Sequence, residues 1–239
     1  MRAEVPEPGP HLEASGWDYL NKYFSEILIS MGVLLLAAGT IDVPRAWLFL
    51  LINLGFSIVS SVIVAILNPE VLNQRNNAFR HNTKKWDVYL LSAYIFLDSI
   101  VMSVMAGLDT GRFSWSSMPD SLFLVGLAAY AASSALTVLA MVYNRYYEIS
   151  ARIQYDRSQR VVEDGPYGWI RHPGYSAIIL GSLSVPLLLG SLYSFVCALA
   201  IVGIMIERTR REDELLRDEL AGYAEYAARV RYRLLPFVW

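Results

Sequence analysis

Aromatic and basic side chains crowd a short segment at residues 165–175, which reads GPYGWIRHPGY. It leads into an apolar run at residues 174–206 that contains no Asp, Glu, Lys, Arg or His. Such a run is typical of helices that lie in a membrane. Cationic and aromatic groups at its entrance would meet a charged cofactor from water and an apolar substrate from lipid. We therefore expect chemistry at this entrance.

A second charged group follows the apolar run. Arg208 and Glu212 are four residues apart, so they project from the same face of a helix. As a plain surface pair, arginine before glutamate is the less favourable order. The spacing therefore favours a functional pair over an ordinary surface ion pair.

The elements that position these groups are predicted to be membrane helices. Hydrophobic residues make up 55% of the chain and charged residues 18%, an apolar excess that is concentrated in segments. The runs 46–67 and 121–144 are free of charge, the run 88–108 is interrupted only by Asp98, and the run 27–41 is shorter. Each is long enough, or nearly so, to cross a hydrocarbon core of about 30 Å. We predict four spanning helices and an all-α polytopic membrane protein.

Asp98 lies near the centre of the third run. A carboxylate at that depth indicates a functional group, such as part of a transport path, or a structural group that is hydrogen-bonded inside the bundle. The sequence leaves both interpretations open.

The apolar run 174–206 is too long for one spanning helix, because as a single helix it would extend about 50 Å. Pro186 removes a helix hydrogen bond, and Gly190 with Ser191 favours a turn soon afterwards. We predict a helical hairpin that enters and leaves on the same side of the membrane. Its two basic ends, residues 171–172 and 208–211, would then lie side by side.

An amphipathic helix is predicted after the hairpin. Its apolar face consists of Leu216, Leu220, Tyr223, Ala227 and Val230. Such a helix could close the mouth of the hairpin as a lid or lie on the membrane surface. The apolar residues 232–239 would insert into the interface.

Basic residues gather in alternate loops, which predicts the orientation. One basic loop carries Arg75, Arg80, His81, Lys84 and Lys85, interpreted as orientation and lipid-headgroup charges, and the other carries Arg145, Arg152, Arg157, Arg160 and Arg171. The positive-inside rule places both loops, both termini and the candidate site in the cytoplasm. The net charge of -2 argues against a nucleic-acid partner.

We divide the chain into a polar tail at 1–22, N-terminal transmembrane helices at 23–143, and a cofactor-binding and catalytic region with hairpin and lid at 144–239.

Several motifs in the last region carry a family resemblance. They are RIQ at 152–154, VVEDGPY at 161–167, RHPGY at 171–175, ERTRREDELL at 207–216, GYAEYAARV at 222–230 and LLPF at 234–237. Together they resemble the isoprenylcysteine carboxyl methyltransferase family, which is also similar to the phospholipid methyltransferases. The resemblance implies an integral membrane enzyme that transfers a methyl group from S-adenosyl-L-methionine without a Rossmann domain. The absence of a Gly-rich strand-to-helix fingerprint from the sequence is consistent with that.

The resemblance also implies particular site residues. Its cofactor contacts fall on Gln154, Gln159, Arg160, Val161, Val162, Tyr167, His172, Pro173, Gly174, Tyr175 and Glu212. Its substrate-side arginine falls on Arg208, and we group Arg208, Glu212 and Arg171 as candidate catalytic residues. Because the segment between Gln154 and Gln159 is shorter than in eukaryotic members, Arg152 is an alternative to Gln154.

The chemistry of a sulfonium cofactor suits these residue types. Aromatic faces and a carboxylate near the cation are supplied by Tyr167, Tyr175, His172 and Glu212. A carboxylate acceptor needs no general base, and an arginine fork such as that of Arg208 could grip it with two hydrogen bonds. An amine acceptor would have to lose a proton, with His172 or Glu212 as the base.

The sequence therefore favours a methyltransferase that acts on a lipophilic acceptor from the bilayer, a lipid or a prenylated thiol acid. Carboxyl O-methylation of a prenylcysteine-like or other lipophilic acid is the preferred reaction. The alternatives are a phospholipid or amine N-methyltransferase, a membrane reductase that uses NADPH and a similar RHP element, and a non-enzymatic transporter or scaffold. Membrane lipids are expected partners, and a metal is not.

Overall fold

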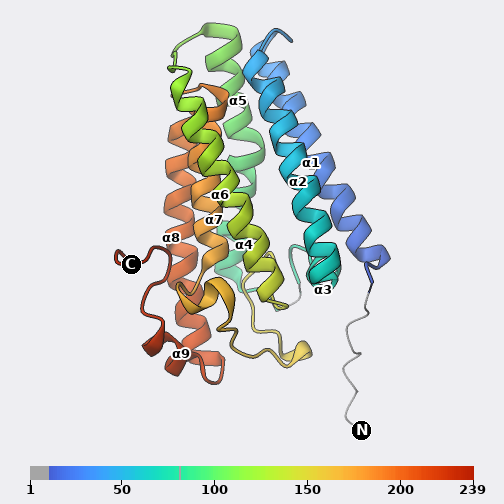
Figure 1. The fold of residues 1–239 in the computed structure, drawn as a ribbon, viewed down its shortest axis with the longest axis vertical. Coiled ribbons are helices and arrows are strands. Elements are labelled where there is room, and N and C mark those ends of the chain that lie inside the picture. Colours follow the sequence, from blue (N-terminus) through green and yellow to red (C-terminus); the bar gives the residue numbers. More distant parts are fainter. Residues whose placement is uncertain (1–10, 81) are drawn as a thin grey trace.

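The computed structural model describes residues 11–80 and 82–239, and it is helical with no strand in those ranges (Figure 1). Residues 1–10 of the predicted tail 1–22 and the whole of His81 lie outside the described residues. The helices are α1 (Ala14–Ala38), α2 (Pro44–Leu67), α3 (Pro69–Gln74), α4 (Lys85–Phe96), η1 (Leu97–Val101), α5 (Met102–Gly107), η2 (Leu108–Phe113), α6 (Ser121–Tyr143), η3 (Tyr155–Arg157), η4 (Gly165–Gly168), α7 (Pro173–Leu189), α8 (Ser194–Glu219) and α9 (Tyr223–Arg229).

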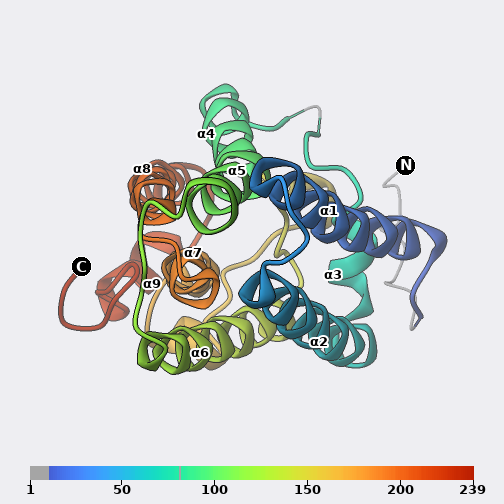
Figure 2. The ribbon, with the colours of Figure 1, turned by 90° about the horizontal axis from the view of Figure 1, so that it is seen from above.

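The four predicted spans are confirmed in the part of the chain that the structure describes. Helices long and apolar enough to cross a membrane cover Ala14–Ala38, Pro44–Leu67, Lys85–Phe113 and Ser121–Tyr143. Seen from above, these spans and the pair α7 and α8 form a ring (Figure 2). The all-α membrane fold predicted from the sequence is therefore correct.

The hairpin prediction is also confirmed. Pro173 occupies the first turn of α7, where its missing N–H has no helical partner to lose. The helix passes through Pro186 and ends at Leu189. It is capped by Gly190, whose backbone is left-handed (φ 74°) and whose N–H donates to the Pro186 carbonyl. A short turn then starts α8, which packs against α7.

The third span is not a regular α-helix. Two π-helical segments, η1 and η2, interrupt it, and Asp98 lies in η1. Single π turns inside helices are frequent at functional sites. Near its C-terminal end this span lies very close to α1. A Cβ added at Gly107 would come within 2.3 Å of the Leu34 carbonyl oxygen. Small residues at such positions let membrane helices pack backbone to backbone.

Two predicted boundaries are wrong. Helix α1 begins at Ala14, inside the expected polar tail, because its start is fixed by α3: the Glu13 N–H donates to the Asn73 side chain at 3.0 Å. The single amphipathic helix is two helices, since α8 ends at Glu219 and α9 begins at Tyr223. Gly222 between them has φ 83°, a left-handed conformation that breaks the helix.

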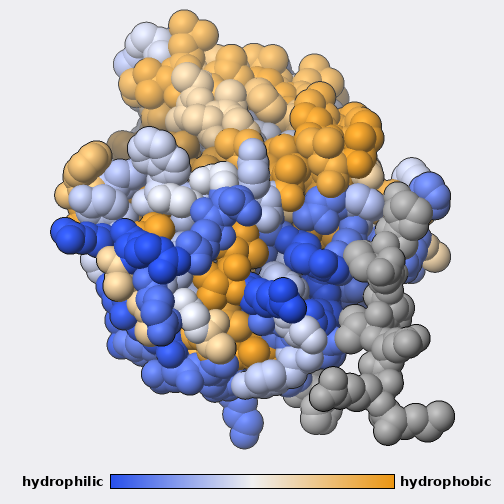
Figure 3. Space-filling model, turned by 60° about the horizontal axis from the view of Figure 1, so that its bottom comes forward, coloured by the Kyte–Doolittle hydropathy of each residue, from blue (hydrophilic) through white to orange (hydrophobic). Residues whose placement is uncertain are grey.

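The polar loops gather at one end of the bundle. Figure 3 shows hydrophilic surface over that end and hydrophobic surface over the rest of the visible face. The loop 144–172, α9 and the chain after α9 lie at this end (Figure 1). The segment that precedes α7 is therefore presented at the boundary between water and lipid.

Candidate functional site

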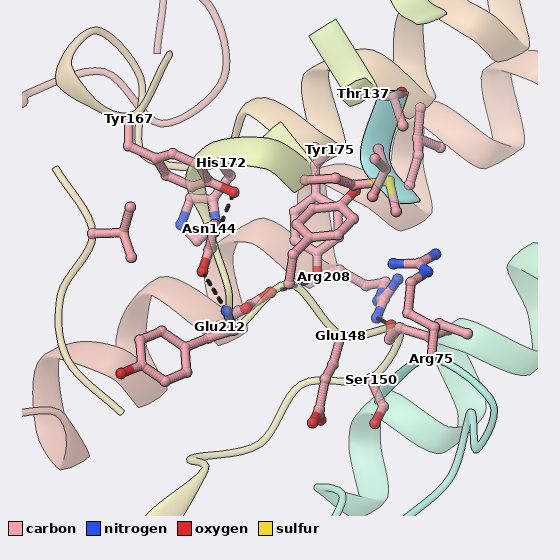
Figure 4. A pocket seen from close by; sticks show the side chains of 18 of the residues that line it. Arg75, Thr137, Asn144, Glu148, Ser150, Tyr167, His172, Tyr175, Arg208 and Glu212 are labelled. Carbon is pink, nitrogen blue, oxygen red and sulfur yellow. Dashed lines mark hydrogen bonds between the residues drawn. The ribbon is translucent and has the colours of Figure 1, made fainter. Parts of the chain in front are cut away.

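A cavity of about 400 Å³ lies inside the ring of helices and opens among these loops (Figure 4). Its outer part is lined by residues of the loop after α6 and by the ends of α7 and α8. Its inner part reaches into the bundle, where Tyr94, Asp98 and Thr137 line it. The cavity thus joins the water-facing loops to the membrane-spanning helices.

The structure brings the predicted site residues together at this cavity, with the exception of Pro173, which is buried in the first turn of α7. The predicted residues that line the cavity are Gln154, Gln159, Arg160, Val161, Val162, Tyr167, Arg171, His172, Gly174, Tyr175, Arg208 and Glu212. Their roles as cofactor or substrate contacts stay predictions.

Arg171 is fully engaged by the protein itself. Its Nε and Nη2 donate to the buried Asp213 carboxylate at 2.7 and 2.9 Å, and its Nη1 donates to the carbonyls of Val230 and Arg231. Burial alone would raise the pKa of Asp213, but hydrogen bonds from His172 and Arg171 outweigh it and hold that pKa well below its usual range. We interpret Arg171 as a structural cation that joins α8 to the C-terminal segment.

His172 and Tyr175 form an aromatic wall beside Glu212. Their rings stack with 5.8 Å between centroids, and the Tyr175 hydroxyl donates to the Glu212 carboxylate. The His172 Nε2 lies 3.4 Å from Asp213 and 3.4 Å from the Tyr223 hydroxyl. Predicted cofactor contacts from the residue before α7, from α7 and from α8 therefore lie next to one another (Figure 4).

Arg208 has the predicted fork geometry, but the fork points at the protein. Its Nε and Nη2 donate to Asp87 at 2.7 and 3.2 Å, and Nη2 also donates to the Ile149 carbonyl. The guanidinium stacks on the Tyr175 ring at 5.0 Å, and the side chain is buried. Only Nη1 has no partner among the described residues, so the two-pronged grip on a substrate carboxylate expected from the sequence is already taken by Asp87.

The loop between α6 and η4 is held by polar contacts. The Gln154 side chain donates to the Tyr146 carbonyl at 2.7 Å and accepts from Arg157 at 2.6 Å, and its backbone N–H donates to Gln159 Oε1 at 2.8 Å. Arg152, the alternative, pairs with Glu148 and with Asp156. Both Gln154 and Arg152 line the cavity. Because Arg152 is neutralised by two carboxylates, its charge is unavailable to a ligand, which favours Gln154.

The C-terminal segment packs on protein, which answers the question of lid or surface anchor for α9. Tyr223, Tyr226 and Ala227 are buried against Ile153 and Leu220. The Tyr226 hydroxyl donates to the Tyr167 carbonyl at 2.7 Å. Further along, the carbonyls of Tyr232 and Arg233 accept the backbone N–H groups of Arg171 and His172, both at 2.9 Å. The segment thus closes one side of the cavity and fixes the RHP motif.

Sequence reasoning missed the buried partners of the site. Asp213 lies in the ERTRREDELL motif but has no role assigned from the sequence, and Asp87 has none either, yet both are completely buried. Arg75 was interpreted as an orientation charge, but it lines the cavity. The only signal in the sequence is the position of Asp87 directly before the apolar run 88–108, and that position does not reveal which residue pairs with it.

The charged residues that line the cavity divide into two groups. Arg152, Arg171 and Arg208 are neutralised by carboxylates, and Glu148 is neutralised by Arg152. The others form no salt bridge to any residue in 11–80 or 82–239, and they are Arg75, Arg160, Asp98 and Glu212. The carboxylate of Asp98 also has no hydrogen-bond partner in those ranges, so the interpretation of Asp98 as a bundle hydrogen bonder is not supported.

The fold and the site define an integral membrane protein with a partly polar cavity at one end of its helix ring. Residues 124–218, from α6 through the loop and α7 to the end of α8, match the sequence model of the Isoprenylcysteine carboxyl methyltransferase (ICMT) family. The family resemblance predicted from the sequence is therefore confirmed over this part of the chain.

A relative of unknown function is similar over a shorter stretch. The chain is 37% identical over 60 residues to the protein described as "Uncharacterized protein YpbQ" of Bacillus subtilis (strain 168). The match covers 24% of this chain and 35% of that protein. The chain thus matches about a third of the length of this relative.

Proposed function

We propose that the protein is an integral membrane methyltransferase that uses S-adenosyl-L-methionine to methylate the carboxylate of a lipophilic acid. The main support is the convergence of the family's contact positions on one cavity within the family-matched residues. Residues from Gln154 to Glu212 are far apart in sequence and line the same space. A chance resemblance in a motif would not require that arrangement.

The residues present suit the proposed cofactor. Glu212 has no cationic partner among the described residues and stands beside the stacked rings of His172 and Tyr175. A carboxylate and aromatic faces together favour a sulfonium cation. Gln154, Gln159 and Arg160 line the same cavity and would hold the amino-acid head and the sugar. When bound, S-adenosylmethionine supplies the methyl group.

The protein's own groups would position the acceptor and exclude water. The inner half of the cavity is walled by membrane helices, so an acceptor with an apolar tail can extend into it. Several hydroxyls there are already satisfied within the bundle, since Ser60 bonds Ser134 at 3.0 Å and Ser133 donates to the Ala177 carbonyl at 2.7 Å. A carboxylate acceptor needs no proton removed, so catalysis would consist of holding the reacting groups in line in a dry site.

One observation favours a second function, methylation of an amine. The unpaired carboxylate of Asp98 faces the inner cavity and could hold a cationic head group. An amine acceptor would also require a base to take its proton. Glu212 is the candidate for that role, because His172 is engaged by Asp213 and Tyr223.

Ligand binding followed by transfer of a labelled methyl group tests the proposal. We expect the purified protein in phosphatidylcholine nanodiscs to bind S-adenosylmethionine and S-adenosylhomocysteine at one site by calorimetry. It should then methylate a lipophilic acid such as N-acetyl-S-farnesylcysteine. Binding of NADPH without any response to S-adenosylhomocysteine would favour the reductase. Transfer to phosphatidylethanolamine but to no acid would favour the amine reaction.

A further inference from the structure

Arg75 differs from the buried arginines of the cavity because no carboxylate neutralises it. Its Nε donates to the Tyr19 hydroxyl at 3.1 Å, and it forms no salt bridge to any residue that the structure describes. Its Nη1 and Nη2 have no hydrogen-bond partner in those ranges either. The only fully buried side-chain nitrogen or oxygen without a partner there is Arg80 Nε, so the terminal nitrogens of Arg75 keep some accessible surface, and Arg75 lines the cavity.

The fold holds this cation rigidly. Arg75 is the residue directly after α3, a short helix that α1 and α6 fix in place: Asn73 accepts the Glu13 N–H, and Asn68 donates to the Met141 carbonyl at 2.8 Å. The guanidinium lies over two rings, 5.3 Å from the centroid of Tyr19 and 5.2 Å from that of Tyr147. Cation–π contacts of this kind orient an arginine without neutralising its charge.

Arg75 is also connected to the cofactor motif. The Tyr147 hydroxyl packs so tightly on Gly174 that a Cβ at that position would come within 2.4 Å of the hydroxyl oxygen. One tyrosine ring therefore separates the Arg75 guanidinium from the RHPGY segment. Figure 4 shows Arg75 and Arg208 reaching into the same space from different elements.

We propose that Arg75 is the anion receptor for the acceptor: it binds the carboxylate, or a phosphate, of the lipophilic substrate. This inference rests on the proposed function and assigns a residue to its substrate side. Arg75 offers free Nη1 and Nη2 groups and an uncompensated charge, which suit two parallel hydrogen bonds to an anion. Arg208 offers one nitrogen, because Asp87 holds the other two. The receptor thus lies directly after α3, upstream of the family-matched residues 124–218.

The test compares the binding of two anionic probes and one neutral probe to wild type, to Arg75→Gln, to Arg75→Lys and to a control variant. The probes are N-acetyl-S-farnesylcysteine, its carboxamide, and farnesyl phosphate, titrated into nanodisc-embedded protein saturated with S-adenosylhomocysteine. We expect Arg75→Gln to weaken binding of the carboxylate about ten- to a hundredfold, and binding of the carboxamide less than twofold. Arg75→Lys, which keeps the charge but loses the fork, should fall between wild type and Arg75→Gln.

Arg145→Gln is the matched control, because Arg145 lies at the same end of the bundle, is half exposed, and does not line the cavity. It should bind all probes as wild type does. Whether carboxylate or phosphate responds more strongly to Arg75→Gln identifies the substrate anion. Unaltered S-adenosylhomocysteine affinity in the variants shows an intact fold.

Two results would overturn the inference. One is an equal loss of binding affinity for the carboxylate probe and for the carboxamide probe in Arg75→Gln. The other is a wild-type protein that prefers neither anionic probe to the carboxamide. Failure of wild type to bind S-adenosylhomocysteine would instead overturn the proposed function, so the two failures are distinguishable.

Discussion

Glu212 and Arg208 are neighbours on α8, yet the protein treats their charges differently. The Arg208 charge is neutralised by Asp87, whereas the Glu212 carboxylate receives only the Tyr175 hydroxyl. A carboxylate without a cationic partner, such as that of Glu212, can attract a cationic ligand to the cavity. The charge of Arg208 is already neutralised by Asp87 and attracts an anionic ligand much less. Individual charges at this site therefore have to be judged by their partners as well as by their position.

If Glu212 faces the sulfonium, its charge should contribute more to the binding of S-adenosylmethionine than to the binding of S-adenosylhomocysteine. We expect Glu212→Gln to weaken S-adenosylmethionine binding about ten- to a hundredfold, because a charged interaction contributes about 1.5 to 3 kcal/mol. The affinity for S-adenosylhomocysteine, which lacks the sulfonium charge, should fall much less in the same titration. Tyr175→Phe keeps the ring and should have a smaller effect. Glu214→Gln, an exposed neighbour on α8, is the control, and equal losses for both ligands would place the carboxylate away from the sulfonium.

Asp87 and Arg208 should behave as one unit in stability measurements. Removing either partner leaves a buried charge uncompensated, so Asp87→Asn and Arg208→Gln should each lower the free energy of unfolding by about 3 to 5 kcal/mol. The double variant should lose much less than the sum. Unfolding in mixed detergent micelles measures the cycle. Additive losses would mean that the bidentate pair is not formed.

The C-terminal segment is the element on which the site depends most. It contributes no predicted cofactor contact, but its backbone carbonyls hold Arg171 and His172. Asp213 connects α8 to that segment through Arg171, Tyr223 and Arg233. A change at this junction should therefore disturb stability and the cofactor motif together.

Asp213→Asn should be strongly destabilising, with a defined pH dependence. The folded pKa of Asp213 lies below its ordinary value of 3.8, so its carboxylate stabilises the fold fully above about pH 4. That contribution is lost as the pH falls further, because the unfolded chain takes up the proton first. The difference in free energy of unfolding between wild type and Asp213→Asn should be about 3 kcal/mol or more near neutral pH and should shrink below pH 4. Asp218→Asn, exposed on the same helix, should show neither effect, and a pH-independent difference would contradict the assignment.

The elements were more predictable than the contacts between them. Apolar runs, Pro186 and Gly190 are local signals, and they predicted the spans and the hairpin. The split between α8 and α9 was missed because Gly222 interrupts a periodicity that continues across it. The partners of Arg208 and Arg171 could not be predicted, since Asp87 is 121 residues from Arg208 and Asp213 is 42 from Arg171. Pairings of that kind depend on how the helices pack, which no local pattern contains.

For the whole molecule, the four spans and the hairpin place the loops of the site at one end of the bundle. That this end faces the cytoplasm is a prediction from the distribution of arginine and lysine. Its consequence is that cofactor and acceptor would approach from different phases, one from water and one from the bilayer.

Single cysteines test the orientation. The chain has one cysteine, the buried Cys197, so Cys197→Ser gives a clean background. In that background, Asp218→Cys should be protected from a membrane-impermeant maleimide in intact cells, and Ser117→Cys at the opposite end should be labelled. Both positions are exposed. Permeabilised cells provide the control, since both thiols should then react, and the reversed pattern in intact cells would invert the topology.

The backbone bonds from Arg171 and His172 to Tyr232 and Arg233 have a consequence for biogenesis. During translation the spans and the hairpin leave the ribosome before residues 230–233 do, so the membrane insertion machinery can handle them while the RHP motif still lacks its partners. The cofactor site would then be assembled only after the hairpin has entered the membrane. A chain truncated after residue 229 and released from the ribosome should be integrated into the membrane with its spans and its hairpin, yet be unable to retain S-adenosylhomocysteine.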